Sequence, residues 1–197
     1  MIKRIFDLII GIVVTTLLLP LGLIIFILIR VFMGYPTIFK QKRPGYKEKI
    51  FTLYKFRTMN NKKNSKNLLL PDDKRTTVLG KILRKTSLDE LPSLINLLKG
   101  EMSLVGPRPL LPQYLKYYSD EQKRRHNVRP GITGWAQING RNELNWSQKF
   151  DLDIWYVDNQ SFYLDLKILL LTIIKVLRFE GINAKGNKPV KEFKGNN

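Results

Sequence analysis

An uncharged apolar run extends from Leu8 to Ile29 and is interrupted near its middle by Pro20. A helix rises about 1.5 Å per residue, so the 22 residues of this run just cover a hydrocarbon core of roughly 30 Å. Proline removes one backbone donor and collides with the carbonyl four residues back, which favours a kink near Thr16 to Pro20. The hydroxyls of Thr15 and Thr16 can bond to the freed carbonyls. The run therefore predicts a bent membrane helix.

Basic residues flank the run on both sides, at Lys3, Arg4, Arg30, Lys40, Lys42 and Arg43. A helix that spans a membrane usually shows a clear asymmetry of Lys and Arg between its ends. The flanks therefore favour a helix that enters and leaves the same membrane face over residues 1–35, although hydropathy alone fits a single-pass anchor equally well. A cleaved signal peptide is not expected, because the run exceeds the usual ~7–15 residues and no small-x-small site follows it.

About 160 residues follow this segment, which is enough for one domain of ordinary size. We expect a cytoplasmic domain over residues 36–180 and a loosely held tail over residues 181–197, whose glycines, asparagines and lysines follow no periodicity. The chain has no cysteine, which excludes disulfides, thiol nucleophiles and cysteine-built zinc sites. Its one histidine, His126, lies in a charged string and is expected to be a solvated residue on a helix face.

The positive charge of the chain is unevenly distributed. Its net charge is +18, from 34 basic and 16 acidic residues, and residues 36–85 alone hold fifteen basic residues against three acidic ones. Such a patch attracts nucleic acid, anionic lipid headgroups or a phosphorylated substrate. The neighbouring membrane segment favours lipid and phosphorylated substrate, while charge alone also fits a solvated basic face.

The remaining sequence predicts a small α+β domain that is mainly helical. Residues 37–42 and 50–56 are rich in β-branched and aromatic side chains and predict a β-hairpin, followed by a polar surface loop over residues 60–77. Ser119 and Gln122 match a capping box. Helices are predicted at residues 78–85, 90–99, 112–118, 120–127, 146–158 and 163–179.

The segment 163–179 carries a broad apolar stripe at helical spacing with charged residues on its other side. A helix of this kind either packs inward as an amphipathic core helix or lies in the membrane interface. The core position is modestly favoured, and one helix can contact both.

Two adjacent acidic residues, Asp89 and Glu90, are the strongest candidates for chemistry. Pro92 is tolerated only in the first turn of a helix, so a helix is expected to begin near Ser87 to Asp89. The helix dipole at that end favours ionised carboxylates, which suits a nucleophile or a Mg²⁺ ligand. Ser87 and Glu90 also match a capping box, and on residue pattern alone this structural explanation is the simpler one.

A second candidate is Arg108, which lies between Pro107 and Pro109. The two prolines restrict the backbone, so the guanidinium is presented from a rigid loop where it can grip a phosphate or a planar base. A third polar, glycine-rich stretch covers residues 131–141, but it lacks the glycine patterns of the common nucleotide-binding folds.

Five motifs together, in this order and spacing, resemble the bacterial sugar transferase family, the monotopic phosphoglycosyl transferases. The motifs are KRIFD at 3–7, KFRTM at 55–59, LDEL at 88–91, LVGPRP at 104–109 and RPGITGW at 129–135. The likeness covers nearly the whole chain. It is strongest to small members that transfer phospho-N,N′-diacetylbacillosamine to undecaprenyl phosphate in bacterial protein glycosylation.

The resemblance implies a re-entrant membrane helix and a helical catalytic domain with interfacial amphipathic helices, at the cytoplasmic face of the bacterial inner membrane. It implies a Mg²⁺-dependent, two-step transfer of sugar-1-phosphate from a UDP-sugar to undecaprenyl phosphate, with release of UMP. In that scheme Asp89 attacks the phosphate that bears the sugar, and Glu90 holds the metal. The implied partners are the two substrates and membrane lipids, without nucleic acid.

The resemblance also implies roles for further residues. Lys55 and Arg84 match positively charged catalytic positions, and Arg108 matches a uridine-contacting motif. Pro20 matches the helix break, although close relatives often have a serine where this chain has Leu19, which leaves a serine-assisted bend without support. The residues expected to bind substrate are Pro107, Arg108, Pro109, Arg129, Gln137 and Arg141.

Two alternatives stay open at this point. The same reaction with UDP-galactose, UDP-glucose or a UDP-N-acetylhexosamine would serve capsule or O-antigen synthesis. A membrane-tethered basic protein that binds lipid or nucleic acid would need the positive charge but neither Asp89 nor Glu90.

Overall fold

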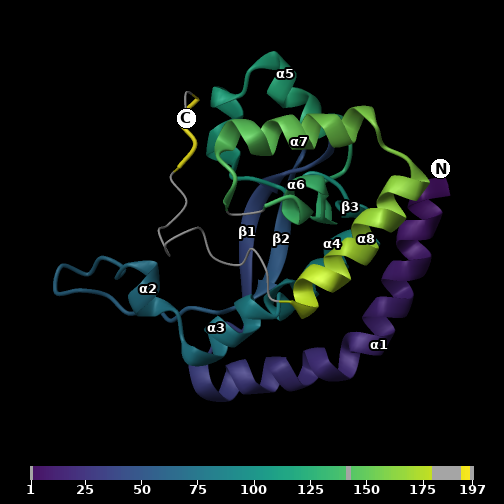
Figure 1. Cartoon of the computed structure of the whole chain (residues 1–197). Coiled ribbons are helices and arrows are strands. Elements are labelled where there is room, and N and C mark those ends of the chain that lie inside the picture. The colour runs from purple at the N-terminus through teal and green to yellow at the C-terminus, as the bar shows by residue number, and fades with distance from the viewer. Residues whose placement is uncertain (1, 141–142, 179–191, 196–197) are drawn as a thin grey trace.

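The computed structural model describes residues 2–140, 143–178 and 192–195. A long bent helix, α1, runs along one side of a domain that consists of short helices and a β-hairpin (Figure 1). The predicted class, α+β and mainly helical, is confirmed. The helices are α1 (Ile2–Met33), α2 (Asp72–Arg75), α3 (Val78–Lys85), α4 (Leu94–Lys99), α5 (Asp120–Lys123), α6 (Trp135–Ile138), α7 (Trp146–Asp158) and α8 (Phe162–Leu177). The 3₁₀ helices are η1 (Tyr46–Glu48), η2 (Leu88–Ser93), η3 (Pro112–Tyr117) and η4 (Arg124–Asn127), and the strands are β1 (Ile38–Pro44), β2 (Ile50–Phe56), β3 (Ser103–Val105) and β4 (Gly131–Thr133).

Helix α1 bends near its middle, and its two halves lie against different parts of the domain (Figure 1). Pro20 lies inside the helix, as its ring and missing donor predict for a bend. Each half buries residues one turn apart, Asp7 and Gly11 in the first half and Ile25 and Ile29 in the second. The first half packs on α4 and β3, and the second joins a core cluster with β2 and α3. Both halves are therefore attached to the same domain.

The N-terminal half of α1 is attached by polar contacts rather than by apolar packing alone. The carboxylate of Asp7, which is only 2% exposed, accepts hydrogen bonds from Ser103 Oγ at 2.7 Å and from Leu104 N at 3.2 Å. Lys3 pairs with the buried carboxylate of Asp165 on α8. These contacts hold the charged start of α1 against the domain.

Most of the apolar surface of α1 faces away from the protein. Within the described part of the chain, α1 alone is long and apolar enough to cross a membrane, and only 11% of its most apolar 18-residue window is buried. One prediction about its bend is wrong: the hydroxyl of Thr15 is buried without any hydrogen-bond partner, so it does not compensate a freed carbonyl.

The β-hairpin forms as predicted and extends to residue 44. β1 and β2 pair antiparallel from Ile38 opposite Phe56 to Pro44 opposite Ile50. The predicted loop 60–77 contains one short helix, α2, and two isolated β-bridges. The predicted helices 78–85 and 146–158 match α3 and α7, whereas the predicted helix 90–99 is divided into η2 and α4.

A parallel pair of three-residue strands was not predicted. Ser103 pairs with Gly131 and Val105 with Thr133, which brings together two loops that are far apart in the sequence. The backbones approach so closely that a Cβ on Gly131 would lie 2.1 Å from Gly106 N. Backbone packing thus requires Gly106 in the motif LVGPRP and Gly131 in the motif RPGITGW. This packing fixes the loop that carries Arg108.

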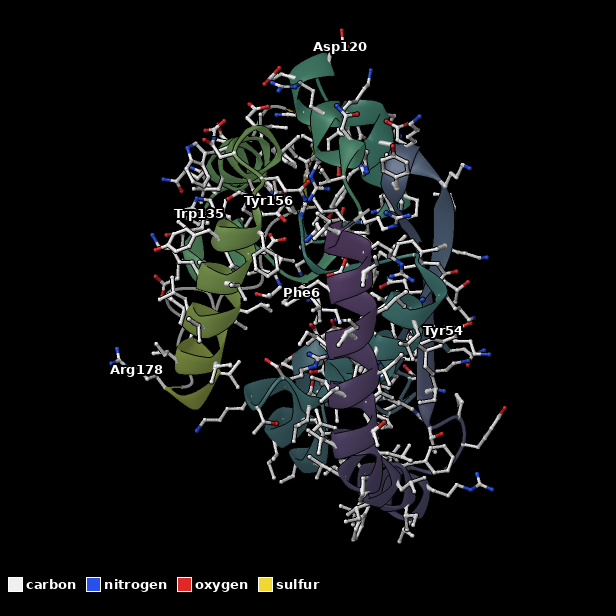
Figure 2. All side chains as sticks on the ribbon, turned by 90° about the vertical axis from the view of Figure 1, so that its right-hand side faces the viewer. Phe6, Tyr54, Asp120, Trp135, Tyr156 and Arg178 are labelled. Carbon is white, nitrogen blue, oxygen red and sulfur yellow. The ribbon has the colours of Figure 1, made fainter. Side chains whose placement is uncertain are left out.

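Helix α8 packs inward at its start and is exposed farther along. Leu164, Asp165 and Ile168 are buried, while Leu170 is 63% and Ile173 58% exposed. Figure 2 shows α8 beside the first half of α1, with Arg178 at its free end. The helix contacts the core, as favoured from the sequence, but its second half leaves an apolar face uncovered.

The expectation that His126 is solvated is wrong. His126 is only 5% exposed, because its ring packs beside Tyr118 and its Nδ1 lies 3.2 Å from the carbonyl oxygen of Gly45. Burial, and then the charge of Arg125, lower the pKa of His126 to about 4, so the ring is neutral near pH 7. The expectation of a loosely held tail over residues 181–197 stays a prediction, because residues 181–191, 196 and 197 lie outside the described part; of the four described tail residues, Phe193 is 2% exposed.

Candidate active site

The acidic pair lies at the start of the 3₁₀ helix η2, directly beside strand β2. Asp89 and Glu90 occupy the first turn of η2, and Pro92 is inside it, close to the predicted position. The predicted capping box is not formed: Ser87 has a left-handed backbone (φ 57°) and its side chain makes no cap bond. The buried amide of Asn96 on α4 makes two hydrogen bonds to the backbone of β2: its Oδ1 accepts from Tyr54 N, and its Nδ2 donates to the carbonyl oxygen of Thr52. These bonds hold α4, which follows η2 directly, against β2.

The side chain of Glu90 is turned toward two cations instead of toward the helix end. Its Oε1 accepts a hydrogen bond from Lys55 Nζ at 2.6 Å and one from Arg108 Nη2 at 2.8 Å. Lys55 comes from β2, and Arg108 from the loop after β3. One carboxylate oxygen therefore joins three separate parts of the fold, and we call Lys55, Glu90 and Arg108 the bridged cluster.

Charge pairing dominates the electrostatics of the bridged cluster. Burial by itself raises the pKa of Glu90, but the charges of Arg108 and Lys55 outweigh it and hold that pKa well below its usual range. The charge of Glu90 raises the pKa of Arg108. Burial, followed by the charge of Arg108, lowers the pKa of Lys55. Glu90 is thus a firmly ionised carboxylate.

Asp89 is in a different situation, because nothing bridges it. Within the described residues, its carboxylate accepts no hydrogen bond. Burial, and then the charge of Glu90, raise the pKa of Asp89, while Lys55, Arg108 and Arg84 oppose the rise. Burial and the like charge of Glu90 thus act against the ionised form of Asp89, in opposition to the effect expected from the helix start. A poorly solvated carboxylate with nearby cations is suited to nucleophilic attack.

Arg84 is held near the acidic pair by one contact. It belongs to the last turn of α3, and its Nε donates to Thr58 Oγ1 at 3.0 Å. Gly80, on the same helix, allows α3 to lie against this segment, since a Cβ there would stand 2.0 Å from the carbonyl oxygen of Thr58. The predicted group of Lys55, Arg84, Asp89 and Glu90 is therefore brought together in space.

A large recess adjoins the bridged cluster. Arg108 lines both a small pocket that contains Lys55 and Glu90 and this larger recess. The recess encloses about 840 Å³ when the open solvent at its mouth is included. Its lining residues are Arg43, Arg108, Leu110, Leu111, Tyr114, Arg125, Ala136, Gln137, Trp146, Lys149 and Asp153.

Two buried polar atoms of residues that line the recess have no partner in the structure. Gln137 donates through Nε2 to the carbonyl oxygen of Ile132 at 3.0 Å, which leaves its Oε1 as an unpaired acceptor. The Nε of Arg43 is likewise an unpaired donor. Burial, and then the charge of Arg108, lower the pKa of Arg43 to about 10. Buried unpaired polar groups are costly and mark positions where a ligand can supply the missing bonds.

The backbone that carries Arg108 is held by a buried ion pair. Arg125 Nη2 donates at 2.7 Å both to Asp153 Oδ2 and to the carbonyl oxygen of Arg108. Sequence reasoning missed Arg125 and Asp153, as well as Arg43, Trp146 and Lys149. Their one available signal was the charged string that contains Arg125, because their relation to Arg108 exists only in the folded chain.

The other residues expected to bind substrate are distributed differently. Pro109 lines the small pocket, and the carbonyl oxygen of Pro107 accepts from Gly131 N at 3.0 Å. Arg129 instead donates to the carbonyl oxygen of Gly100 and lines neither pocket. Arg141 lies outside the described residues.

The carboxylates fit a divalent cation that is completed by substrate. Within residues 2–140, 143–178 and 192–195, no three His, Asp or Glu side chains converge into a metal cage. Mg²⁺ is commonly held by one or two carboxylates together with substrate phosphates rather than by protein alone. Asp89 and the Oε2 of Glu90, which accept no hydrogen bond in the described structure, are acceptable oxygen donors for such a site.

Comparison with known proteins identifies the family. Residues 1–179 match the family described as bacterial sugar transferase. A Bacillus subtilis (strain 168) protein named uncharacterized sugar transferase EpsL is 54% identical over 193 residues, which cover 98% of this chain and 96% of that protein. The chain therefore belongs to the bacterial sugar transferase family.

Longer relatives carry more specific names. The undecaprenyl-phosphate galactose phosphotransferase of Salmonella typhimurium is 39% identical over 197 residues, which cover 91% of this chain and 41% of that protein. The UDP-glucose:undecaprenyl-phosphate glucose-1-phosphate transferase of Escherichia coli K12 is 38% identical over 185 residues, which cover 89% and 40%. This chain thus spans about two fifths of the length of each.

The buried pair of Arg125 and Asp153 gives a prediction about stability. Arg125→Met leaves the carboxylate of Asp153 buried and unpaired, so the free energy of unfolding should fall by about 3–5 kcal/mol. Denaturant unfolding in detergent measures it. The neighbouring Arg124, whose ion pairs with Glu121 and Asp158 are exposed, provides the matched control: Arg124→Met should change stability little. Equal losses in the two variants would contradict a structural role for the buried pair.

Proposed function

We propose that this chain transfers sugar-1-phosphate from a UDP-sugar to undecaprenyl phosphate at the cytoplasmic face of the bacterial inner membrane, releasing UMP. The observation that carries the proposal is the contrast between two adjacent carboxylates. Glu90 is bridged by two cations, while Asp89 is poorly solvated and unbridged. The relatives named for galactose and glucose phosphotransfer support the same class of reaction.

The first step is an attack by Asp89 on the phosphorus that bears the sugar. An oxygen of the Asp89 carboxylate forms a bond to this phosphorus, the phosphoanhydride bond to UMP breaks, and UMP leaves with the bonding electrons. The product is an aspartyl phosphosugar. In the second step a phosphate oxygen of undecaprenyl phosphate attacks the same phosphorus, and the Asp89 carboxylate is released unchanged.

The bridged cluster supports both steps by neutralising charge. Lys55, Glu90 and Arg108 all line the small pocket, where the phosphates of the donor would add negative charge. Glu90 would hold Mg²⁺, which when bound would supply charge neutralisation on the phosphoanhydride. Arg84 adds a further positive charge near Asp89.

The large recess is suited to the nucleoside part of the donor. Arg108 lines both cavities, so a ligand that places its diphosphate on Arg108 can extend into the recess. The aromatic side chain of Trp146 offers a surface for a planar base, and Gln137, which lines the same recess, stays a predicted substrate contact. Roles for Arg129 and Arg141 in substrate binding stay predictions.

The re-entrant arrangement is supported by the contacts of α1. Lys3 and Asp7 at the start of the helix and Ile25 and Ile29 near its end all contact one domain. A spanning helix would carry Lys3 and Asp7 to the opposite side of the bilayer and break their contacts. The exposed apolar faces of α1 and of the second half of α8 would then contact lipid.

The proposed reaction leaves open which UDP-sugar is the donor. The sequence likeness suggested UDP-N,N′-diacetylbacillosamine, and this stays a prediction, whereas the names of two relatives favour UDP-galactose or UDP-glucose. Release of UMP from a panel of these donors in the presence of undecaprenyl phosphate would rank them.

The covalent intermediate can be captured directly. Incubation of the wild-type protein with UDP-sugar labelled in the sugar, without lipid acceptor, should leave label on the peptide that contains Asp89. Asp89→Asn removes the attacking charge while keeping the shape, so labelling and turnover should fall to background. The control is Asp120→Asn, a change at a fully exposed carboxylate of α5, which should retain both. Turnover near the wild-type rate in Asp89→Asn would contradict the nucleophile and favour direct transfer.

The charge of Arg84 predicts a shift in the pH profile. That charge lowers the pKa of Asp89, so Arg84→Gln should raise this pKa and move the acid limb of kcat/KM for the donor to higher pH. Arg84→Lys keeps the charge and should keep the limb near its wild-type position. Lys81→Gln, at an exposed residue of the same helix, is the matched control. If the acid limb does not move in Arg84→Gln, the limb does not report the titration of Asp89, and this prediction is contradicted.

Cysteine labelling tests the topology, since the chain has no background thiols. Single cysteines at Ile2 and Tyr46 should both react with a membrane-impermeant reagent from the cytoplasmic side only. Labelling of the Ile2 cysteine from the periplasm, with the Tyr46 cysteine labelled only from the cytoplasm, would establish a spanning helix and contradict the re-entrant proposal.

A further inference from the structure

The described C-terminal segment, residues 192–195, places one aromatic side chain, Phe193, in the core of the domain. Phe193 is 2% exposed and belongs to a cluster with Tyr114, Tyr118, Trp146 and Phe150. In Figure 1 this segment lies near the start of α7, on the side of the domain away from the connection between α7 and α8. It also lies beyond residues 1–179, which match the family. An element outside the family match is thus built into the domain.

Phe193 packs against two residues that line the large recess. Its ring centroid lies 5.8 Å from that of Tyr114 and 5.6 Å from that of Trp146, and these two rings are themselves 5.4 Å apart. Phe193 does not itself line the recess. It therefore packs against the aromatic wall from outside the recess and contacts both rings.

The same wall also positions a charge. Lys149 Nζ lies 4.7 Å from the centroid of the Trp146 ring, within the range of a cation–π contact, and both residues line the recess. If Trp146 changed its orientation, Lys149 would lose this contact. Loss of Phe193 would remove a large apolar side chain from a packed cluster and leave space into which Tyr114 and Trp146 can turn.

We infer that Phe193 is a positioning residue for the nucleotide-sugar donor, through which the C-terminal segment fixes the aromatic wall of the donor recess. The inference rests on the proposed function, in that it takes the recess as the nucleoside site. It adds that the segment after the catalytic domain contributes to donor affinity. A residue with this role affects donor binding selectively, whereas a merely structural residue affects stability without such selectivity.

The test compares variants of the full-length protein. Phe193→Ala should raise KM for the UDP-sugar and Kd for UMP by about tenfold or more, equivalent to roughly 1.4 kcal/mol. Its KM for undecaprenyl phosphate and its kcat should stay within about twofold of wild type. Phe193→Leu keeps apolar volume and should recover most of the affinity. The control Ile168→Ala, at a fully buried residue of the other core cluster, should lower the melting temperature without changing Kd for UMP.

Titration calorimetry with UMP separates the two proposals. If the wild type binds no UMP, the proposed function fails, and the role of Phe193 fails with it. If the wild type binds UMP and turns over but Phe193→Ala binds it equally well, only the inference about Phe193 is overturned. An equal weakening of UMP binding in Phe193→Ala and Ile168→Ala would also overturn it, because affinity would then follow general stability.

Discussion

The double hydrogen bond to Glu90 Oε1 is the interaction on which the site depends. The two donors are Lys55 on β2 and Arg108 in the loop after β3, and both are held against Glu90 on η2. A buried carboxylate with two such partners stays ionised, because the loss of hydration is offset by charge-assisted hydrogen bonds. The two cations are then paired with Glu90, and its neighbour Asp89 is left unbridged. The chemical difference between two adjacent acids thus arises from their contacts rather than from their position in the sequence.

The rest of the fold keeps the second cation in place. Close backbone packing between Gly106 and Gly131 sets the course of the loop that carries Arg108. The buried pair of Arg125 and Asp153 then holds the carbonyl oxygen of Arg108 from the other side. Because Arg108 lines both cavities, the same restraints that complete the cluster also set the entrance of the large recess.

The sequence predicted those elements of the site that are determined by residues close together in the chain. Pro92 located the helix start with Asp89 and Glu90, and the β-branched runs located the hairpin that supplies Lys55. The three-residue strands β3 and β4 were missed, because so short a segment has no periodicity and its pairing joins distant parts of the chain. The capping box at Ser87 was wrong because the cations that attract Glu90 lie far away in sequence. Burial of His126 and Phe193 depends in the same way on tertiary contacts.

The central claim is that the unbridged Asp89 takes part in a two-step displacement, and isotope exchange tests it most directly. Labelled UMP is incubated with the protein, Mg²⁺ and unlabelled UDP-sugar, without undecaprenyl phosphate. If Asp89 forms a covalent phosphosugar and releases UMP before any acceptor binds, label should enter the UDP-sugar pool, and Asp89→Asn should abolish the exchange. A protein that turns over with acceptor but exchanges no label in its absence would contradict the account.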